Sequence, residues 1–401
     1  MKKKVIIIAY DLNPYIGSEA GVSFIWSQIL SKEYDLTIFT QSIHKANLET
    51  FGSELTINYI DRTPYLSKFL TRFHLYNIDY SLFIRKVKKA IGSDNKIDVK
   101  NSVIHFMSPF GIHSYSDLAR DLKVPYIVGP AGGYLVMPKG FEAYRKLPMI
   151  LKEFFYGRLL KNKNWKFYFE NAKAIVCGTD LVAKHLPLIA QNKVSIIYDS
   201  VVDTDYFNPA GSTRQETDQI TIVFTGRLVL YKGVFLLLKA FERISREHPN
   251  VMLIYAGEGH ERTSLERYVT EKNLTNRVVF TGRINREQLK MLLLNSDIYC
   301  LPTLKDPGGN AILEAMSCGL PVISTNYGGP AYSVAENCGV LINPISIVDY
   351  VHRLSEALVT LIEDEDLRKR LGNNARDHVV TNFSSSELNN RILKFYRKAL
   401  S

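Results

Sequence analysis

One pattern runs through both halves of the chain: a short run rich in Val and Ile ends in small residues and leads into a helical stretch. Strands that alternate with helices in this way form parallel sheets with helices on their faces. The runs are KVIIIA (4–9), DLTIFT (35–40), SVIHFMS (102–108), PYIVGPAGG (125–133), KAIVCGT (173–179), ITIVFTGR (220–227), VMLIYAGEG (251–259), RVVFTGRI (277–284), SDIYCLPT (296–303) and LPVISTNYGG (320–329). We therefore predict an α/β protein with two doubly wound, Rossmann-like domains.

The length of the chain also favours two domains, because 401 residues is long for one hydrophobic core. A polar, turn-rich stretch at 206–219 separates the two sets of strands. We place the N-terminal domain at 1–203 and the second domain at 204–382. Ligands of such sheets gather at the carboxyl ends of the strands, so the predicted site is a cleft in which the two domains face each other.

Three further features indicate a cytosolic protein. The start, MKKKVIIIAYD, imitates a signal peptide, but Asp11 interrupts the apolar run and a first β-strand is the better interpretation. The longest apolar runs are far too short to span a bilayer. The cysteines show no C-x-x-C spacing and lie in apolar surroundings, which predicts buried, reduced thiols. They are Cys177, Cys300, Cys318 and Cys338.

Positive charge is concentrated in the first half of the chain. The net charge is +10; residues 1–200 hold 27 Lys and Arg against 17 Asp and Glu, and residues 201–401 hold 23 of each. Bases mix with aromatic residues in 62–100 and 139–173. Such a mixture suits an anionic membrane surface. A nucleic-acid patch has a similar composition, and a solvated basic face whose rings turn to the core is the third interpretation.

A basic loop follows the first strand of the second half. The sequence GRLVLYKG (226–233) places Arg227 and Lys232 around a short loop, with Lys232 at a helix start. An arginine can grip two phosphate oxygens and a lysine adds a point charge, so the pair suits a diphosphate beside helix-terminal N–H groups. Surface Arg and Lys pairs are common, and this motif alone is a weak signal.

A glycine-containing loop follows the first strand of the chain. In GSEAG (17–21), Gly17 permits a close backbone approach to a phosphate, and Ser18 starts a helix whose dipole faces it. The segment is not the G-x-G-x-x-G of dinucleotide binders, and the chain has no Walker A motif. A structural turn is the alternative interpretation.

The stretch LPTLKDPGGNAILEAMSCGLPVIST (301–325) carries two acids beside a helix start. We predict Asn310 as the N-cap of a helix over 311–317 and Gly319 as its left-handed stop. Asp306 in the loop and Glu314 in the helix converge if the loop folds back over the helix N-terminus, where free N–H groups accept an anion. Asp306 would then contact sugar hydroxyls, and Glu314 would hold a ribose diol. The alternative is a surface turn with a solvated glutamate.

Together these motifs resemble the retaining glycosyltransferases of family 4, which have the GT-B fold. GRLVLYKG, followed by two acids with seven residues between them, carries most of the resemblance. AYDLNPYIGSEAGVSFIW, VGPAGG and SVVDTDYF are also similar to that family. The resemblance implies that 383–401 form a final helix that packs back on the N-terminal domain.

The resemblance also implies roles for individual residues. Arg227 and Lys232 would bind the donor diphosphate, and His105 would lie near the reacting sugar; a satisfied core histidine is the alternative for His105. The predicted catalytic residues are Arg227, Lys232, His105 and Asp306. The predicted donor-binding residues are Gly17, Ser18, Arg227, Lys232, Asp306, Gly309, Asn310, Ala311 and Glu314.

Two departures from the family pattern concern the sugar pocket. The family usually has Glu at the first acid position, where this chain has the shorter Asp306, and Gly-Phe-Gly after it, where this chain has Pro-Gly-Gly at 307–309. A D-x-D sequence at 203–205 binds a metal in another glycosyltransferase fold, but here it matches a linker motif of the family. We assign it no metal.

The predicted function is transfer of a hexose, with retention and without a metal or cofactor, from a nucleotide diphosphate sugar, UDP-sugar before GDP-sugar. The acceptor would be a hydroxyl of a lipid-linked saccharide used for surface polysaccharide, reached from the cytoplasmic face of a membrane to which the basic domain binds. The alternatives are a GT-B nucleotide-sugar epimerase and a catalytically idle nucleotide-sugar or glycan-binding subunit. A nucleic-acid binder would leave both glycine loops unused, so we predict no nucleic-acid partner.

Overall fold

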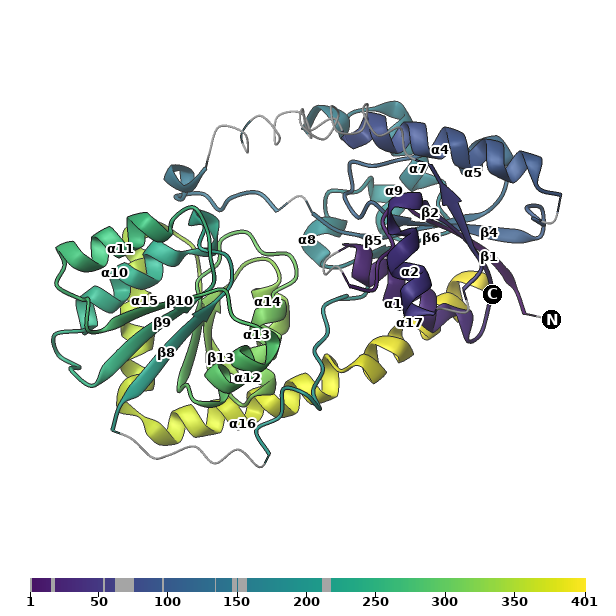
Figure 1. The fold of residues 1–401 in the computed structure, drawn as a ribbon. Coiled ribbons are helices and arrows are strands. Elements are labelled where there is room, and N and C mark those ends of the chain that lie inside the picture. Colours follow the sequence, from purple (N-terminus) through teal and green to yellow (C-terminus); the bar gives the residue numbers. More distant parts are fainter. Residues whose placement is uncertain are drawn as a thin grey trace. The chain divides into compact units, whose positions relative to one another are not determined.

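The structure is a computed structural model of the whole chain. It describes residues 2–15, 19–52, 55–61, 76–95, 97–133, 135–145, 150, 157–210 and 218–401, except the side chains of 76 and 77. The chain forms two compact units (Figure 1). Unit 1 comprises 1–134, 151–199 and 389–401, and unit 2 comprises 135–150 and 200–388.

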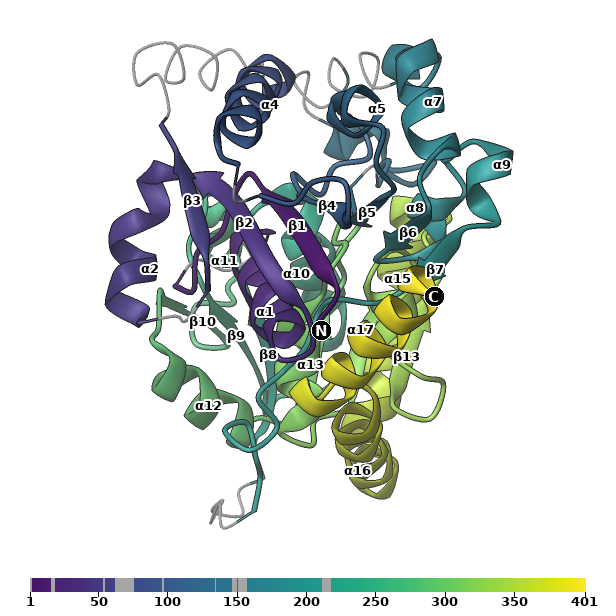
Figure 2. The ribbon, with the colours of Figure 1, turned by 90° about the vertical axis from the view of Figure 1, so that its right-hand side faces the viewer.

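Unit 1 is built on a seven-stranded parallel sheet with the order β3-β2-β1-β4-β5-β6-β7, which can be followed across Figure 2. Its strands are β1 (Lys4–Ala9), β2 (Asp35–Gln41), β3 (Ile57–Ile60), β4 (Ser102–Ser108), β5 (Tyr126–Ala131), β6 (Ala174–Cys177) and β7 (Val194–Ile196). Its helical elements are α1 (Glu19–Ser31), η1 (Ser42–His44), α2 (Lys45–Phe51), α4 (Tyr76–Ser93), α5 (Leu118–Leu122), α7 (Lys163–Glu170), α8 (Asp180–Ala183) and α9 (Leu188–Gln191).

Unit 2 has a six-stranded parallel sheet with the order β10-β9-β8-β11-β12-β13. Its strands are β8 (Ile220–Thr225), β9 (Val251–Ala256), β10 (Val278–Gly282), β11 (Ile298–Leu301), β12 (Val322–Thr325) and β13 (Gly339–Ile342). Its helical elements are η2 (Glu142–Tyr144), η3 (Leu230–Lys232), α10 (Val234–Ile244), α11 (Arg262–Glu271), α12 (Arg286–Leu294), α13 (Asn310–Ser317), α14 (Pro330–Ser333), α15 (Ile347–Glu363) and α16 (Glu365–Asn382). The closing helix α17 (Ser385–Leu400) passes from unit 2 into unit 1.

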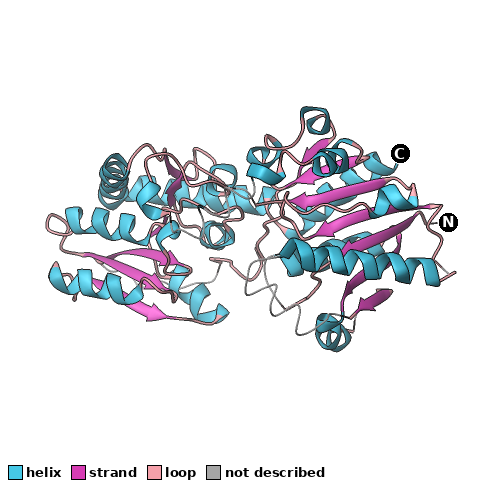
Figure 3. Ribbon diagram, turned by 90° about the horizontal axis from the view of Figure 1, so that it is seen from above, coloured by secondary structure: helices cyan, strands magenta, loops and turns pink. Residues whose placement is uncertain are grey.

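The layers of each unit follow from the apolar strands that the sequence predicts. All of β1 after Lys4 is buried, as are β11 and β12 throughout. Strands that are apolar on both faces must be covered on both faces, and Figure 3 shows helices on either side of each sheet. The two doubly wound α/β domains predicted from the sequence are therefore confirmed. All four cysteines are buried and unpaired.

In each sheet the strand order reverses beside the first strand. The reversal lies between β1 and β4 in unit 1 and between β8 and β11 in unit 2. The loops that leave the carboxyl ends of two such strands diverge to opposite faces, which opens a crevice for a ligand. In unit 2 the loops at this point are 226–233 and 302–309, the two stretches that the sequence analysis singled out.

The division of the chain differs from the predicted 1–203, 204–382 and 383–401. The cuts lie after Asp199 and Leu388, and 135–150 belong to unit 2. The reason is local packing: the ring of Phe141 lies 5.9 Å from that of Tyr350, and the Tyr327 hydroxyl donates to the carbonyl of Val136 at 2.7 Å. No helical or strand periodicity marks this short segment in the sequence.

Within the described residues, no helix combines the length and the apolar character needed to cross a membrane.

Candidate functional site

The first part of the site is the loop between β8 and α10. Arg227 is exposed and donates to the hydroxyl of Tyr231, and its guanidinium also lies 5.8 Å from the centre of that ring. Lys232 ends η3, and Gly233, in the left-handed conformation, is the N-cap of α10. The loop therefore presents two cations beside the start of a helix, as the sequence predicts.

A second loop, which follows β9, packs against the backbone of the first loop. The N–H of Leu228 donates to the carbonyl of Glu258 at 2.9 Å. A Cβ on Gly257, whose φ is +148°, would lie 1.9 Å from the carbonyl oxygen of Gly226. Only glycine allows this approach. The run GEG at 257–259 was the sequence signal for this support, but its role depends on β8 and β9 being neighbours.

Asp306 and Lys232 meet at the carboxyl edge of the second sheet. They form an ion pair through Nζ and Oδ2, and their side chains are only 16% (Lys232) and 13% (Asp306) exposed. Oδ1 of Asp306 accepts from the N–H groups of Gly308 and Gly309 at 3.3 and 3.2 Å. The loop thus folds back over the helix start, and the anion that meets these two N–H groups is the carboxylate of Asp306 itself.

Helix α13 begins one residue earlier than predicted. Its N-cap is Gly309, in the left-handed conformation, and no side chain caps it, so the assignment of Asn310 as the N-cap is wrong. Gly309 allows the turn that brings Asp306 over the helix start, and Asn310 already has helical geometry. The N–H groups of Asn310 and Ala311 belong to the first turn, where a helix supplies no acceptor. Gly319, with a φ of +80°, follows the helix end as predicted.

Glu314 lies on the second turn of α13 and is partly buried. Burial raises the pKa of its carboxyl from 4.5 to about 7, and only the positive charge of Arg286 opposes the shift. Arg286 itself pairs with Asp203 at 2.9 Å. Glu314 therefore changes its ionisation near neutral pH, which an exposed glutamate does not do.

The loop after β12 holds the backbone of Asp306. The N–H of Gly329 donates to the Asp306 carbonyl at 2.8 Å. Gly328 has a φ of +65°, and a Cβ there would lie 2.7 Å from the same carbonyl oxygen. The two glycines of TNYGG thus position Asp306. Sequence reasoning identified the run as a strand-ending loop but did not connect it with the site.

Three of the predicted site residues, Gly17, Ser18 and His105, belong to unit 1. Gly17 and Ser18 lie outside the described residues. His105 is fully buried; its Nε2 lies 2.6 Å from the carbonyl oxygen of Gly129, and its Nδ1 pairs with the hydroxyl of Tyr396. Burial lowers the pKa of His105 to about 4, against the raising effect of the Gly129 bond. His105 thus has the satisfied core environment that was the alternative interpretation.

The D-x-D sequence lies near the start of unit 2, and Asp203 has partners within that unit. Asp203 pairs with Arg286 and accepts from the N–H of Tyr206 at 3.0 Å. The Tyr206 hydroxyl in turn donates to Glu287 at 2.8 Å. Among the described residues, no group of three or more His, Cys, Asp or Glu side chains has a metal-binding arrangement.

Two doubly wound parallel sheets, with a cationic loop site at the reversal point of the second, define an α/β protein of the GT-B class. A crystal structure of Anabaena HepE in complex with UDP has this fold; it matches with a TM-score of 0.67 at 16% identity and covers 98% of this chain and 100% of that one. Residues 210–378 match the family described as glycosyl transferases group 1.

Relatives in sequence carry glycosyltransferase names. The phosphatidylinositol N-acetylglucosaminyltransferase gpi3 subunit of Schizosaccharomyces pombe is 32% identical over 43% of this chain and 38% of its own length. The lipopolysaccharide core biosynthesis glycosyltransferase LpsE of Rhizobium meliloti is 27% identical over 57% of this chain and 65% of its own length. The chain thus covers about two fifths and two thirds of these two relatives.

Proposed function

We propose that the protein is a retaining glycosyltransferase that moves a sugar from a nucleotide diphosphate sugar to an acceptor hydroxyl. The observation that carries this proposal is the meeting of Arg227, Lys232, Asp306 and the first turn of α13 at the carboxyl edge of one sheet. The glycosyltransferase names of the sequence relatives support it. The UDP bound by HepE supports UDP-sugar rather than GDP-sugar as the donor.

The cations stabilise the leaving diphosphate in the proposed reaction. Negative charge develops on the diphosphate as the bond between its oxygen and the anomeric carbon breaks. Arg227, Lys232 and the N–H groups of Asn310 and Ala311 are oriented before the reaction, and such preorganised groups stabilise this charge without further reorganisation. These groups supply the positive charge that a metal ion would otherwise bring.

When the donor binds, Lys232 and Asp306, which pair with each other in its absence, each bind a different part of it. An arriving diphosphate attracts the ammonium group of Lys232, and the Asp306 carboxylate then accepts hydrogen bonds from hydroxyls of the transferred sugar. In the retaining step, the acceptor oxygen bonds to the anomeric carbon on the face that the diphosphate leaves. The acceptor proton passes to an oxygen of the leaving phosphate. Glu314 holds the ribose diol when it is ionised.

A surface of unit 1 supports a membrane-bound acceptor. Helices α7 and α9 pack against each other, and the side chains of Leu188 and Ile189 on α9 are 81% and 63% exposed. Phe167, 40% exposed, and the exposed Lys163 and Lys166 come from α7. Protruding aliphatic groups beside lysines suit an anionic membrane interface. We propose that this α7–α9 surface binds the cytoplasmic face of a membrane and that the acceptor is a lipid-linked saccharide.

Nucleotide binding and turnover test the proposal together. Thermal shifts with UDP, GDP, ADP and their sugars should show one stabilising nucleotide, UDP. Arg227→Ala should lower kcat/KM for sugar transfer by at least ~10²-fold, in line with the loss of one charge-stabilising donor. Arg267→Ala, an exposed arginine on α11, is the matched control. Release of free sugar without an acceptor would favour the epimerase, and binding without turnover would favour the idle subunit.

A further inference from the structure

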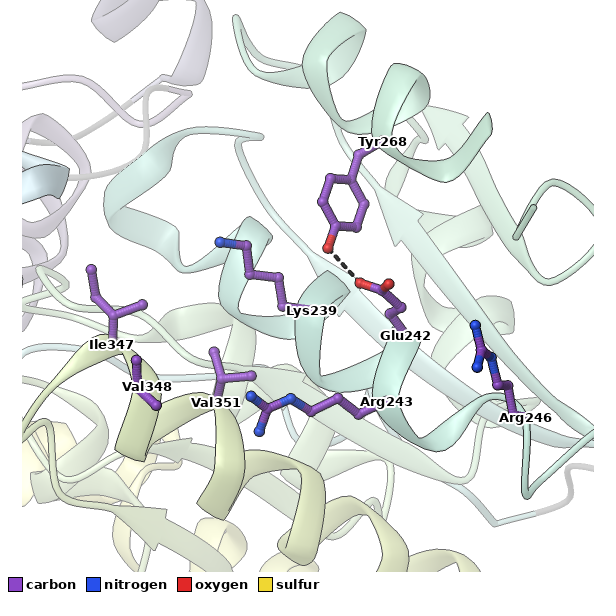
Figure 4. Close-up of a pocket in the computed structure, with 8 residues that line it drawn as sticks. All are labelled: Lys239, Glu242, Arg243, Arg246, Tyr268, Ile347, Val348 and Val351. Carbon is purple, nitrogen blue, oxygen red and sulfur yellow. Dashed lines mark hydrogen bonds between the residues drawn. The ribbon is translucent and has the colours of Figure 1, made fainter. Parts of the chain in front are cut away.

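A hollow on unit 2 lies outside the loops that form the donor site. It has a volume of about 460 Å³, within the range of small-ligand pockets. Three helices line it: α10, α11 and α15 (Figure 4). Its lining residues are Lys239, Glu242, Arg243, Arg246, Tyr268, Ile347, Val348 and Val351.

One side of the hollow is a stripe of positive charge. Lys239 and Arg243 are both exposed and lie four residues apart on α10, so they share one face of that helix, and the exposed Arg246 follows just beyond the helix end. Like charges at such spacings repel and destabilise a helix. Within the described part of the chain, neither Lys239 nor Arg243 forms an ion pair. An anion between them would relieve the repulsion.

The acids near the stripe already have cationic partners. Glu242 pairs with Lys272 at 2.9 Å and accepts from the hydroxyl of Tyr268. Asp349, next to Val348 in the chain, pairs with Arg353 at 3.1 Å. The negative charges that would otherwise repel an anionic ligand are therefore compensated, and the charge of the stripe remains.

The other side of the hollow is aliphatic. Ile347, Val348 and Val351 come from the first two turns of α15, and Val348 is 73% exposed. Figure 4 shows the Arg243 side chain extended toward Val351, with Lys239 on the same side of Glu242 and Arg246 on the other. A ligand that reaches both Lys239 and Arg243 therefore lies next to an apolar wall.

We propose that this hollow binds the phosphate group of a ligand that has an apolar portion beside the phosphate. Lys239 and Arg243 bind the phosphate oxygens, and Ile347 and Val348 contact the apolar portion. A phospholipid headgroup region and a free phosphate ester share this chemistry. The proposal does not rest on sugar transfer, because none of these side chains belongs to the donor loops.

Calorimetric titration of the full chain tests the proposal with two probes, inorganic phosphate and dihexanoylphosphatidylglycerol below its micelle concentration. Each Lys or Arg side chain that faces an anionic headgroup changes the binding affinity by a factor of ~5. Lys239→Gln/Arg243→Gln should therefore lower the affinity for both probes by about 25-fold. The control Lys369→Gln/Arg370→Gln makes the same charge change on α16 and should leave both affinities within about two-fold. The thermal shift with UDP should be the same for Lys239→Gln/Arg243→Gln as for the wild type.

The apolar wall has its own variant. Val348→Ser should weaken the phospholipid but not inorganic phosphate, and this result assigns the hollow to a phospholipid. Equal affinity for the two probes, with no effect of Val348→Ser, would assign it to a free phosphate ester and overturn the role of the wall. The whole proposal would be overturned if Lys239→Gln/Arg243→Gln and the control Lys369→Gln/Arg370→Gln had equal affinities for the probes. It would also be overturned if neither probe bound the wild type.

Discussion

Glu314→Gln should stabilise the protein above pH 7 while it weakens the donor site. Burial raises the pKa of the Glu314 carboxyl from 4.5 to about 7 in the folded state. Above pH 7 the folded protein must hold an ionised carboxylate that the unfolded chain holds at no penalty. The difference of about 2.5 pKa units corresponds to about 3 kcal/mol of lost stability. Because Glu314 keeps part of its solvent exposure, we expect about 1.5–3 kcal/mol.

The sign of the pH dependence follows from the protons bound in each state. Between pH 4.5 and 7 the folded protein binds more protons at Glu314 than the unfolded chain, so this residue lowers stability as the pH rises through that window. The glutamine variant stays neutral throughout. Its stability should therefore match that of the wild type near pH 4.5 and exceed it at pH 8.5.

Thermal unfolding without ligand, scanned from pH 5 to 8.5, checks this prediction. For a unit of this size, about 1.5–3 kcal/mol corresponds to a rise in Tm of about 3–12 °C at pH 8.5. Glu356→Gln, on α15 with its side chain 64% exposed, is the control and should shift Tm little at any pH. A variant whose Tm at pH 8.5 equals or falls below that of the wild type, or whose Tm difference ignores pH, would refute the reasoning.

The same variant should lose UDP affinity by about tenfold at pH 8, because a carboxylate accepts from both hydroxyls of a ribose diol and an amide does not. In the wild type, UDP affinity should rise between pH 6 and 8 as Glu314 ionises. A flat pH profile of UDP affinity in the wild type would contradict the role of Glu314 at the ribose.

Three further predictions concern other parts of the molecule. Asp306→Asn should change the preference among donor sugars more than the affinity for UDP; an unchanged donor profile would argue against its contact with the sugar. His105→Leu should lower stability by about 2–4 kcal/mol in thermal unfolding, because it leaves the Gly129 carbonyl and the Tyr396 hydroxyl buried and unpaired. The kcat of this variant should stay within about two-fold of the wild-type value. A large loss of kcat at unchanged Tm would indicate a catalytic role for His105. Leu188→Ser/Ile189→Ser should weaken binding to phosphatidylglycerol vesicles by at least ~30-fold without lowering Tm, since both side chains are exposed; unchanged flotation with the vesicles would exclude the α7–α9 surface as the membrane contact.

Local sequence patterns were enough to predict the class of fold. The first strand was predicted over Lys4–Ala9 and is observed there, because an apolar run that ends at a polar residue is a local property. The glycine that ends α13 was likewise predictable, since Gly319 alone offers the left-handed conformation at low cost. Arg227, Lys232 and Asp306 were assigned to one donor site through the resemblance of GRLVLYKG, and of the two acids that follow it, to the family 4 glycosyltransferases.

What only the tertiary structure decided is the partner of each polar group. Lys232 and Asp306 are 74 positions apart in the chain, and their ion pair exists because β8 and β11 are neighbours in the sheet. The sequence left the partners of His105 open, and α17 supplies the Tyr396 hydroxyl that pairs with its Nδ1.

The segment 135–145 and Glu314 show the same limit. The segment packs on unit 2 through single contacts, such as that of Phe141 with Tyr350, which leave no periodic pattern in the sequence. The raised pKa of Glu314 depends on how much of the surrounding chain covers it. The sequence by itself determined which elements form, because their signals are local; burial and pairing arise between residues distant in the chain, and only the folded structure decided them.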